Sequence, residues 1–319
     1  MTQHQAQQQA EQRTGSPRKG KRRRDEYQMV PDATFTSYYG RPVVKASPWQ
    51  ADIPGYLFLG GLAAGSSLLA AGADLTGRPA LRRAGRLGAF AAINLSFAAL
   101  VHDLGRPARF LNMVRVAKPT SPMSVGTWLL TGFGPLAGLA GAAELAPLLA
   151  EKLPRPLRAP ARLVAAAGRP SGLAAAVIGP TIATYTAVLL ADTATPTWSG
   201  ARRELPFVFA GSAAAAAGGF GMLCAPVDQA GPARRLALAG AVADLAAEQA
   251  MEQRLGMVAE SLHTGTAGRL MRASKALTVT GAAGSVLAGS RIGRRSRALS
   301  AVSGLALLAG SACTRFGIF

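Results

Sequence analysis

Residues 53–73, IPGYLFLGGLAAGSSLLAAGA, form a stretch of chain without a charged side chain. A helix needs about 20 such residues to cross a hydrocarbon core of roughly 30 Å. Because that core holds no water, only a helix or a closed barrel can satisfy its backbone there. The stretch lacks the alternating pattern of a barrel strand, so we predict a transmembrane helix.

Seven similar blocks follow, separated by short basic loops. They lie near residues 86–104, 124–146, 172–192, 205–224, 233–260, 266–289 and 298–314. Only 16% of the chain is charged, against roughly a quarter of a soluble domain. We therefore predict an all-α integral membrane protein in which residues 51–319 form eight transmembrane helices. The proline-bearing stretch 147–170 is expected to be a loop long enough to separate two helical bundles, and the eight helices are expected to form two four-helix bundles.

The net charge of +19 lies mainly in the amino-terminal tail and in the loops between apolar blocks. Loop charges in those places face lipid headgroups, so the chain is predicted to reside in the cell membrane as a multi-pass protein and not to bind nucleic acid. Residues 1–50 are polar and basic and cannot bury a core, which predicts a largely disordered tail. The loops on the side away from the tail carry more Lys and Arg, whereas the tail has its own basic run. The sequence thus leaves the orientation open.

Titratable residues gather at one end of the predicted bundle. Every even-numbered helix ends on the side where the tail lies, which places His102, Asp103, Asp192 and His263 at the same membrane face. Tyr185 lies seven residues before Asp192, on the same face of its helix and about 10 Å away along the axis. Ionisable groups inside a membrane are costly and commonly functional. We therefore regard this end as the candidate site.

A second set of acids lies within one predicted span. Asp244, Glu248 and Glu252 recur every four residues, so three carboxylates share one stripe of the helix 233–260. They are candidates for proton transfer through the membrane. The alternative is a long helix whose polar part pairs with arginines of another helix or leaves the bilayer.

One segment carries a resemblance to a known family. It comprises the residues 102–107 (HDLGRP), Arg109-Phe110 and 121–128 (SPMSVGTW), with weaker echoes at 56–65, 183–190 and 206–212. This combination resembles the NrfD/PsrC family, the membrane subunits of polysulfide reductase and its relatives. The likeness extends over roughly residues 38–315.

The resemblance implies an eight-helix subunit that has no haem or iron–sulfur cluster of its own and is not catalytic alone. Such a subunit pairs with a ferredoxin-like iron–sulfur protein and often with a molybdopterin catalytic subunit. It exchanges electrons with a quinone, here expected to be menaquinone, near the membrane surface.

The resemblance also implies roles for individual residues. Tyr185 matches the tyrosine of the family's fourth helix and is the first candidate for a hydrogen bond to the quinone. His102 and Asp103 are candidates for quinone binding and proton transfer, and Arg106 for a structural ion pair with Asp103. The start of the first helix departs from the pattern, because it offers Tyr56 where relatives have Asn or His.

Three other functions remain open on the sequence. A haem-b cytochrome with two haems needs four intramembrane histidines, and the chain has three histidines in all. A secondary transporter predicts inverted repeats with broken helices, and no clear repeat is present. A membrane anchor without quinone chemistry fits the departure in the first helix. Cys224 and Cys313 lie alone in apolar runs, so they form no cluster motif for iron–sulfur or zinc, and no metal site is expected.

Overall fold

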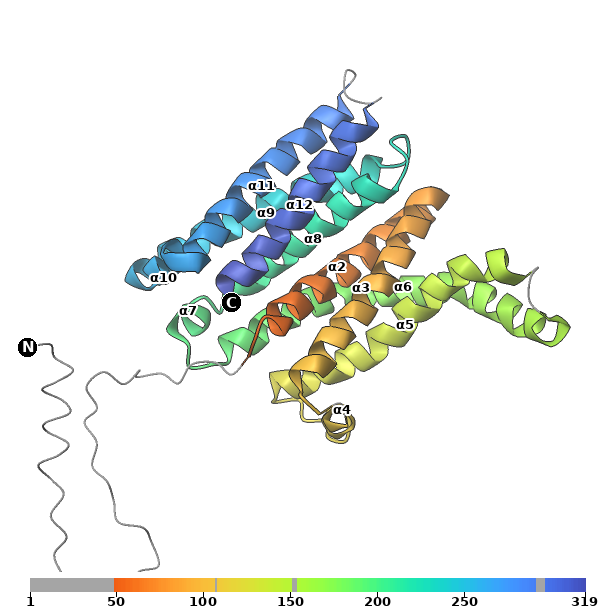
Figure 1. The fold of residues 1–319 in the computed structure, drawn as a ribbon, viewed down its shortest axis with the longest axis horizontal. Helices are drawn as coiled ribbons and strands as arrows, with labels where there is room; N and C mark the ends of the chain where they lie inside the picture. Colours follow the sequence, from red (N-terminus) through yellow and green to blue (C-terminus); the bar gives the residue numbers. More distant parts are fainter. Residues whose placement is uncertain (1–48, 107, 151–153, 291–295) are drawn as a thin grey trace, which may run out of the picture. The chain divides into compact units, whose positions relative to one another are not determined.

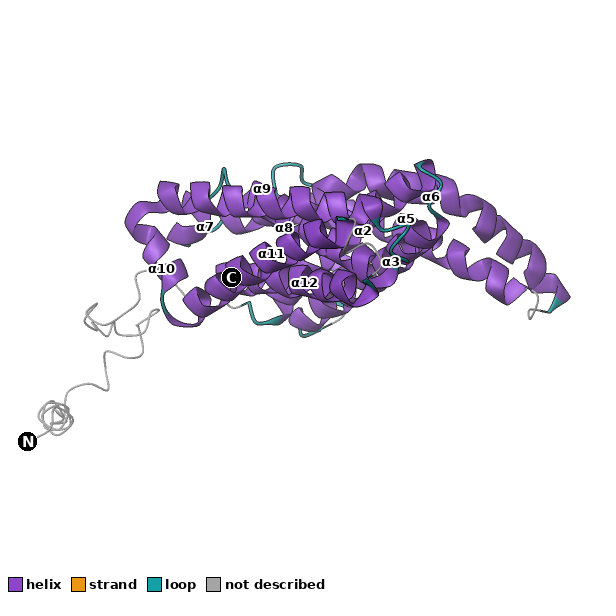
Figure 2. Ribbon diagram, turned by 90° about the horizontal axis from the view of Figure 1, so that it is seen from above, coloured by secondary structure: helices purple, strands orange, loops and turns teal. Residues whose placement is uncertain are grey.

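A computed structural model describes residues 49–106, 108–150, 154–290 and 296–319. Their secondary structure is helical throughout, with short connecting loops (Figures 1 and 2). The long helices are α2 (Asp52–Leu75), α3 (Pro79–Asp103), α5 (Pro122–Ala150), α6 (Arg155–Ala191), α8 (Leu205–Cys224), α9 (Gly231–Leu255), α11 (Gly265–Gly289) and α12 (Arg297–Ile318). Four shorter segments connect them: α4 (Arg109–Met113), α7 (Pro196–Gly200), η3 (Gly256–Ala259) and α10 (Glu260–His263).

Each of the eight predicted spans coincides with one long helix. Within the described residues, six of these helices are long and apolar enough to cross a membrane: α2, α3, α5, α6, α8 and α12. Helices α9 and α11 are similarly long but are not among these six; α9 carries six charged side chains and α11 carries three. The helices themselves are confirmed in all eight cases, whereas the crossing of α9 and α11 stays a prediction. Residues 1–48, which hold almost all of the predicted tail, lie outside the described residues.

The expected loop over residues 147–170 is wrong. Helix α5 continues to Ala150, and α6 begins at Arg155. The segment after Arg155 is rich in Ala, Leu and Arg, which are strong helix formers. Pro156 occupies a first-turn position, where its missing N–H costs nothing. The prolines therefore begin a helix here and do not mark a bundle boundary.

The long helices pack in two groups that follow their order in the chain. Helices α2, α3, α5 and α6 contact one another, and so do α8, α9, α11 and α12; α8 also packs against α2 and α6. Small residues allow close approach at these seams. A Cβ on Gly65 would lie 2.7 Å from the Cβ of Ala217, and one on Gly240 would overlap the backbone of Ala215. The many small residues in these helices thus serve helix contact.

A buried ion network ties together α2, α3, α5 and α6. Glu144 accepts hydrogen bonds from Arg82 Nε at 2.8 Å and from Arg86 Nη1 at 2.9 Å. Asp74 at the end of α2 lies 3.2 Å from Arg169 Nε and 3.7 Å from Arg86 Nη2. The network lies where α2 and α5 end and α3 begins, beside the middle of α6, so it occupies the opposite end of this group from residues 102–104.

Aromatic side chains gather at the end where α2 starts. Trp49 stacks on Trp198 of α7 with ring centroids 6.3 Å apart, and Trp198 stacks on Phe319 at 5.5 Å. The indole Nε1 of Trp198 donates to the carbonyl of Ile318 at 2.7 Å. In Figure 1, α4, α7 and α10 lie toward this end. The predicted placement of the titratable helix ends on one face is therefore consistent with the packing.

Candidate functional site

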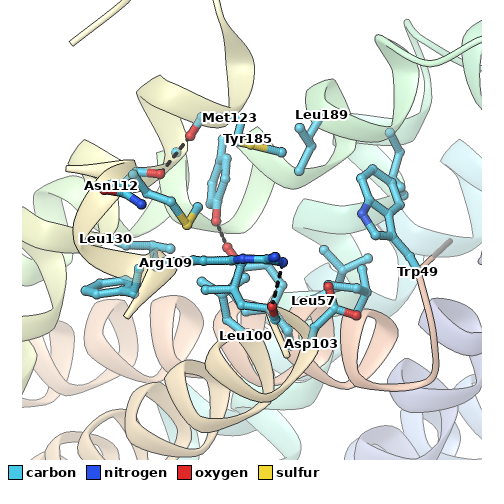
Figure 3. Close-up of a pocket in the computed structure, with 18 residues that line it drawn as sticks. Trp49, Leu57, Leu100, Asp103, Arg109, Asn112, Met123, Leu130, Tyr185 and Leu189 are labelled. Carbon is cyan, nitrogen blue, oxygen red and sulfur yellow. Dashed lines mark hydrogen bonds between the residues drawn. The ribbon is translucent and has the colours of Figure 1, made fainter. Parts of the chain in front are cut away.

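A cavity of about 430 Å³ opens among the ends of α2, α3, α5 and α6 (Figure 3). Most of its wall is apolar, and polar groups are few. The lining residues are Trp49, Ile53, Tyr56, Leu57, Leu100, Asp103, Leu104, Arg109, Phe110, Asn112, Met113, Met123, Gly126, Thr127, Leu130, Tyr185, Leu189 and Leu190. Binding sites for small organic molecules commonly have this volume and this balance of apolar wall and sparse polar groups.

Two tyrosine hydroxyls meet inside the cavity. Tyr56 of α2 and Tyr185 of α6 are hydrogen-bonded to each other through their hydroxyl oxygens, although 129 residues separate them in the chain. Their side chains are nearly buried, with 5% and 8% of their surface exposed. The carbonyl of Tyr56 accepts a hydrogen bond from Ser96 Oγ at 3.1 Å, which fixes α2 against α3 at this level. The pair offers phenolic protons at an otherwise apolar surface.

Gly126 of α5 makes room for this arrangement. A Cβ at this position would overlap the ring of Tyr185, so the ring lies directly on the helix backbone. One residue further, Thr127 turns its hydroxyl to the carbonyl of Met123 at 2.9 Å. The segment 121–128, singled out in the sequence, thus forms one wall of the cavity and orients Tyr185.

Charged and polar groups lie where the cavity meets the connection between α3 and α5. Asp103, half-buried, ends α3, and exposed Arg109 begins α4. Arg109 Nη1 donates to the carbonyl of Leu104 at 3.4 Å, and the guanidinium points toward the centre of the cavity in Figure 3. Asn112 adds an amide to the same rim. The site therefore combines a carboxylate, a guanidinium and two phenols around an apolar space.

His102 lies outside the lining of the cavity. Its Nδ1 lies 2.8 Å from Oδ2 of Asp52, and 80% of its side chain is exposed. Neighbouring residues on a helix point about 100° apart, because a turn takes about 3.6 residues, so Asp103 can face the cavity while His102 does not. Of the three predicted quinone ligands, the structure brings Tyr185 and Asp103 together and leaves His102 beside them.

The ion pair predicted between Arg106 and Asp103 is not among those that the described residues form. Gly105, with a φ of 66°, reverses the chain directly after α3, and Arg106 is exposed. The cavity instead takes its arginine from position 109. Sequence spacing missed this exchange because it cannot show which residue of a tight connection turns inward.

The acidic stripe of α9 is not part of the cavity. Asp244 and Glu248 are buried among the later helices, and Glu252 accepts a hydrogen bond from Lys275 Nζ of α11 at 2.7 Å. His263 Nε2 lies 3.8 Å from Glu252. The three carboxylates therefore form a separate polar cluster, and their role in proton transfer stays a prediction.

Two functional candidates were not assigned from the sequence. Tyr56 was recognised only as the one polar residue that could replace the family's Asn or His, and its pairing with Tyr185 required the fold. Arg315 lies just beyond the predicted span 298–314 and would be taken for an interfacial arginine. In the structure it is one of the largest fully buried side chains.

In the described ranges, no three His, Cys, Asp or Glu side chains lie close enough together to hold a metal ion. The cavity's own chemistry is that of hydroxyl, carboxylate and guanidinium groups.

Comparison with known proteins agrees with the resemblance. The family model described as "Polysulphide reductase, NrfD" matches residues 43–251, which include the whole cavity lining. A search of curated proteins finds no match. Because the family match covers well over half of the chain, and its matched region includes both tyrosines and the connection after α3, the chain belongs to the NrfD polysulphide reductase family.

Proposed function

We propose that this membrane subunit binds a quinone, expected to be menaquinone, in the cavity between Tyr56 and Tyr185. In this role it passes electrons between the quinone pool and an iron–sulfur cluster of an extrinsic partner. The observation that carries the proposal is the hydrogen-bonded pair of buried tyrosines within an apolar cavity that ends at Asp103. Family membership supports the context, because NrfD proteins are membrane subunits of polysulphide-reductase-type complexes.

The residues of the cavity fit such a ligand. A flat aromatic head with two carbonyl oxygens needs apolar walls and a hydrogen-bond donor near at least one oxygen. Leu57, Leu130 and Leu190 supply apolar wall, and the phenols supply donors. When bound, a quinol supplies two electrons and two protons, and a quinone takes up the same number.

Each polar group then has a task. Tyr185, held against Gly126, orients the ligand through its hydroxyl while Tyr56 holds that hydroxyl in place. Asp103 accepts or returns a proton at the cavity rim, where a carboxylate can exchange with water. Arg109 provides a positive charge beside it. His102, paired with Asp52 at the surface, is a candidate for carrying that proton onward.

We further propose that all eight long helices cross the membrane, as two four-helix bundles. Helices α9 and α11 have 25 residues each and pack against α8 and α12, both of which have the length and composition of spans. The cavity then lies at one membrane face. An iron–sulfur partner, and through it a molybdopterin subunit, would dock there, because electron transfer requires a short distance to the quinone.

The test uses the complex assembled with its partners and measures quinol-linked electron transfer. Tyr185→Phe and Tyr56→Phe should each weaken quinone binding roughly 3- to 10-fold, the worth of one hydrogen bond. Asp103→Asn should lower turnover by about 100-fold if it is the proton acceptor.

Matched controls lie nearby. Thr184→Ala removes an exposed hydroxyl that bonds only to carbonyls of its own helix, and Asp192→Asn alters an exposed carboxylate outside the cavity. Both should leave activity unchanged. Full activity in Tyr56→Phe, Tyr185→Phe and Asp103→Asn alike would instead favour a membrane anchor without quinone chemistry.

A further inference from the structure

A trio of charged side chains is buried between α9 and α12, away from the cavity. Asp244 and Glu248 lie one turn apart on α9, and Arg315 lies near the end of α12; each is 1% exposed. Burying an ion in a membrane protein is costly unless a partner compensates its charge. The buried charges of these three side chains must therefore be balanced.

Arg315 is held by groups that leave its charge intact. Its Nη2 donates to the carbonyl of Phe209 at 2.7 Å, and its guanidinium lies 3.6 Å from the centre of the Phe209 ring. Its Nε and Nη1 have no hydrogen-bond partner, and its electrostatic partner is Asp244. A Cβ on Gly61 of α2 would lie 3.3 Å from Nη2, so the guanidinium fills the space that this glycine leaves. Arg315 thus supplies one positive charge to a site that has unfilled hydrogen-bonding capacity.

The carboxylates have equally little compensation. Oδ1 of Asp244 and both side-chain oxygens of Glu248 lack hydrogen-bond partners. Buried hydroxyls of the surrounding helices bond to one another: Ser274 to Thr314 at 2.6 Å, and Ser212 to Ser311 at 2.7 Å.

Other charges on the surrounding helices belong to neighbouring pairs, of which Lys275 and Glu252 both act electrostatically on Glu248 with opposite signs. Lys275 of α11 bonds Glu252 at 2.7 Å, and His263 lies 3.8 Å from the same carboxylate. Arg254 of α9 bonds Glu204 next to α8 at 3.1 Å. The buried trio is left with two acids and one base.

We infer that Asp244, Glu248 and Arg315 form a buried proton-binding site that holds one exchangeable proton. With both acids ionised the trio would carry a net charge of −1, and with both protonated it would carry +1. One proton on either carboxyl makes it neutral, which is the state that a low-dielectric interior favours. The inference does not depend on quinone binding.

The site opens toward one end of the helices only. On one side, Glu248 is followed one turn later by partly exposed Glu252, with Lys275 and His263 beside it. This is the end where Leu255 packs on Gly200 of α7.

On the other side of Asp244, the seam between α8 and α9 is closed. Cβ atoms on Gly240 or Gly218 would overlap the backbone of the facing helix, and Ala241 and Ala237 are fully buried. A proton therefore reaches the site from the end where the cavity lies. Because no polar route leaves Asp244 in the other direction along this seam, we expect the trio to store a proton and not to pass it onward between α8 and α9.

Infrared spectroscopy of the purified full chain in nanodiscs tests directly how many protons the trio holds. A protonated carboxyl gives a carbonyl stretching band that an ionised carboxylate lacks, and the band shifts in D₂O. The wild type should show such a band from one buried carboxyl. Asp244→Asn and Glu248→Gln should each abolish it, because the remaining carboxylate then pairs with Arg315. Arg315→Met should double it, because both acids must then be neutral.

Two variants serve as controls for this experiment. Arg315→Lys keeps the charge, and Glu204→Gln alters a pair near the surface, so both should keep the wild-type band. A wild type without the band, or a band that persists in either Asp244→Asn or Glu248→Gln, overturns the inference. If Arg315→Met does not fold, these two acid variants still decide it. Glu252→Leu should slow the shift of the band in D₂O, and an unchanged rate would contradict access from that end.

Discussion

Gly126 of α5 faces the ring of Tyr185 at a point where a methyl group would overlap the ring. Gly126→Ala should therefore displace Tyr185, reduce quinone binding and destabilise the fold by about 1–3 kcal/mol through overpacking. Thermal melting and titration with a quinol analogue measure the two effects. Gly138→Ala on the same helix is the control, because nothing lies within 4 Å of its Cβ position. Equal behaviour of the two variants would show that the ring does not depend on Gly126.

Glu144 is the acid that holds Arg82 and Arg86 at the far end of the same helices. Glu144→Ala leaves Arg86 with the weaker contact to Asp74, so the buried guanidinium is poorly compensated. Breaking a buried pair from one side costs about 3–5 kcal/mol, which should appear as a marked fall in melting temperature. Glu260→Ala, at an exposed position, should change it little. A small effect of Glu144→Ala would mean that water already reaches the network.

At the scale of single residues, the sequence identified half of the site. Tyr185 and Asp103 line the cavity. The sequence placed both near one end, because helix spacing and the alternating direction of successive helices are enough for that. The contact between Tyr56 and Tyr185 joins α2 to α6, and no local pattern encodes which residues of two distant helices meet. His102 lies outside the cavity, and Arg109 lines it in place of Arg106, for a similar reason: the direction of a side chain at a helix end depends on the turn that follows.

At the scale of helices, α6 shows where proline misled the sequence interpretation. A proline cluster suggested a loop, but α6 contains Pro160, Pro170 and Pro180 within 37 helical residues. The eight apolar blocks were found because hydropathy over 20 residues is a strong signal. The beginning of α6 was not found, because prolines are tolerated in membrane helices whose freed backbone groups find other partners.

A substitution distinguishes the two interpretations of this segment. In a helix interior, proline removes a hydrogen bond and costs about 3 kcal/mol, so Pro160→Ala should raise the melting temperature. In a loop, the same change should lower stability by about 0.4–1 kcal/mol, because alanine frees the unfolded chain. Pro119→Ala, outside any helix, provides that comparison. A fall in melting temperature for both variants would place Pro160 in a loop.

At the scale of the whole molecule, the structure predicts which connections share a membrane face. After both native cysteines are replaced by serine, single cysteines at Asn112 and Ser261 should be labelled by an impermeant reagent from one side. Cysteines at Gly77 and Asp228 should be labelled from the other. The pair Asp228 and Ser261 flanks α9 and tests its crossing directly. Labelling of both from the same side would reduce the number of spans.

The two halves of the chain differ in what they contain. The first four long helices hold the cavity and the ion network around Glu144, whereas the buried proton site lies between α9 and α12. Arg315 meets the first half where Gly61 leaves space. As an NrfD family member the chain is a membrane subunit of polysulphide-reductase-type complexes, and the division separates its cavity from the trio of Asp244, Glu248 and Arg315.

The pairing of Tyr56 with Tyr185 also has a consequence for biogenesis. All residues around the cavity lie between Trp49 and Leu190, so the ribosome has produced them before it reaches α8. Chains generally fold from the amino-terminal end during translation. A nascent chain arrested after α6 therefore already contains every residue that lines the cavity. Helix α8, which is made later, packs against α2, α3 and α6.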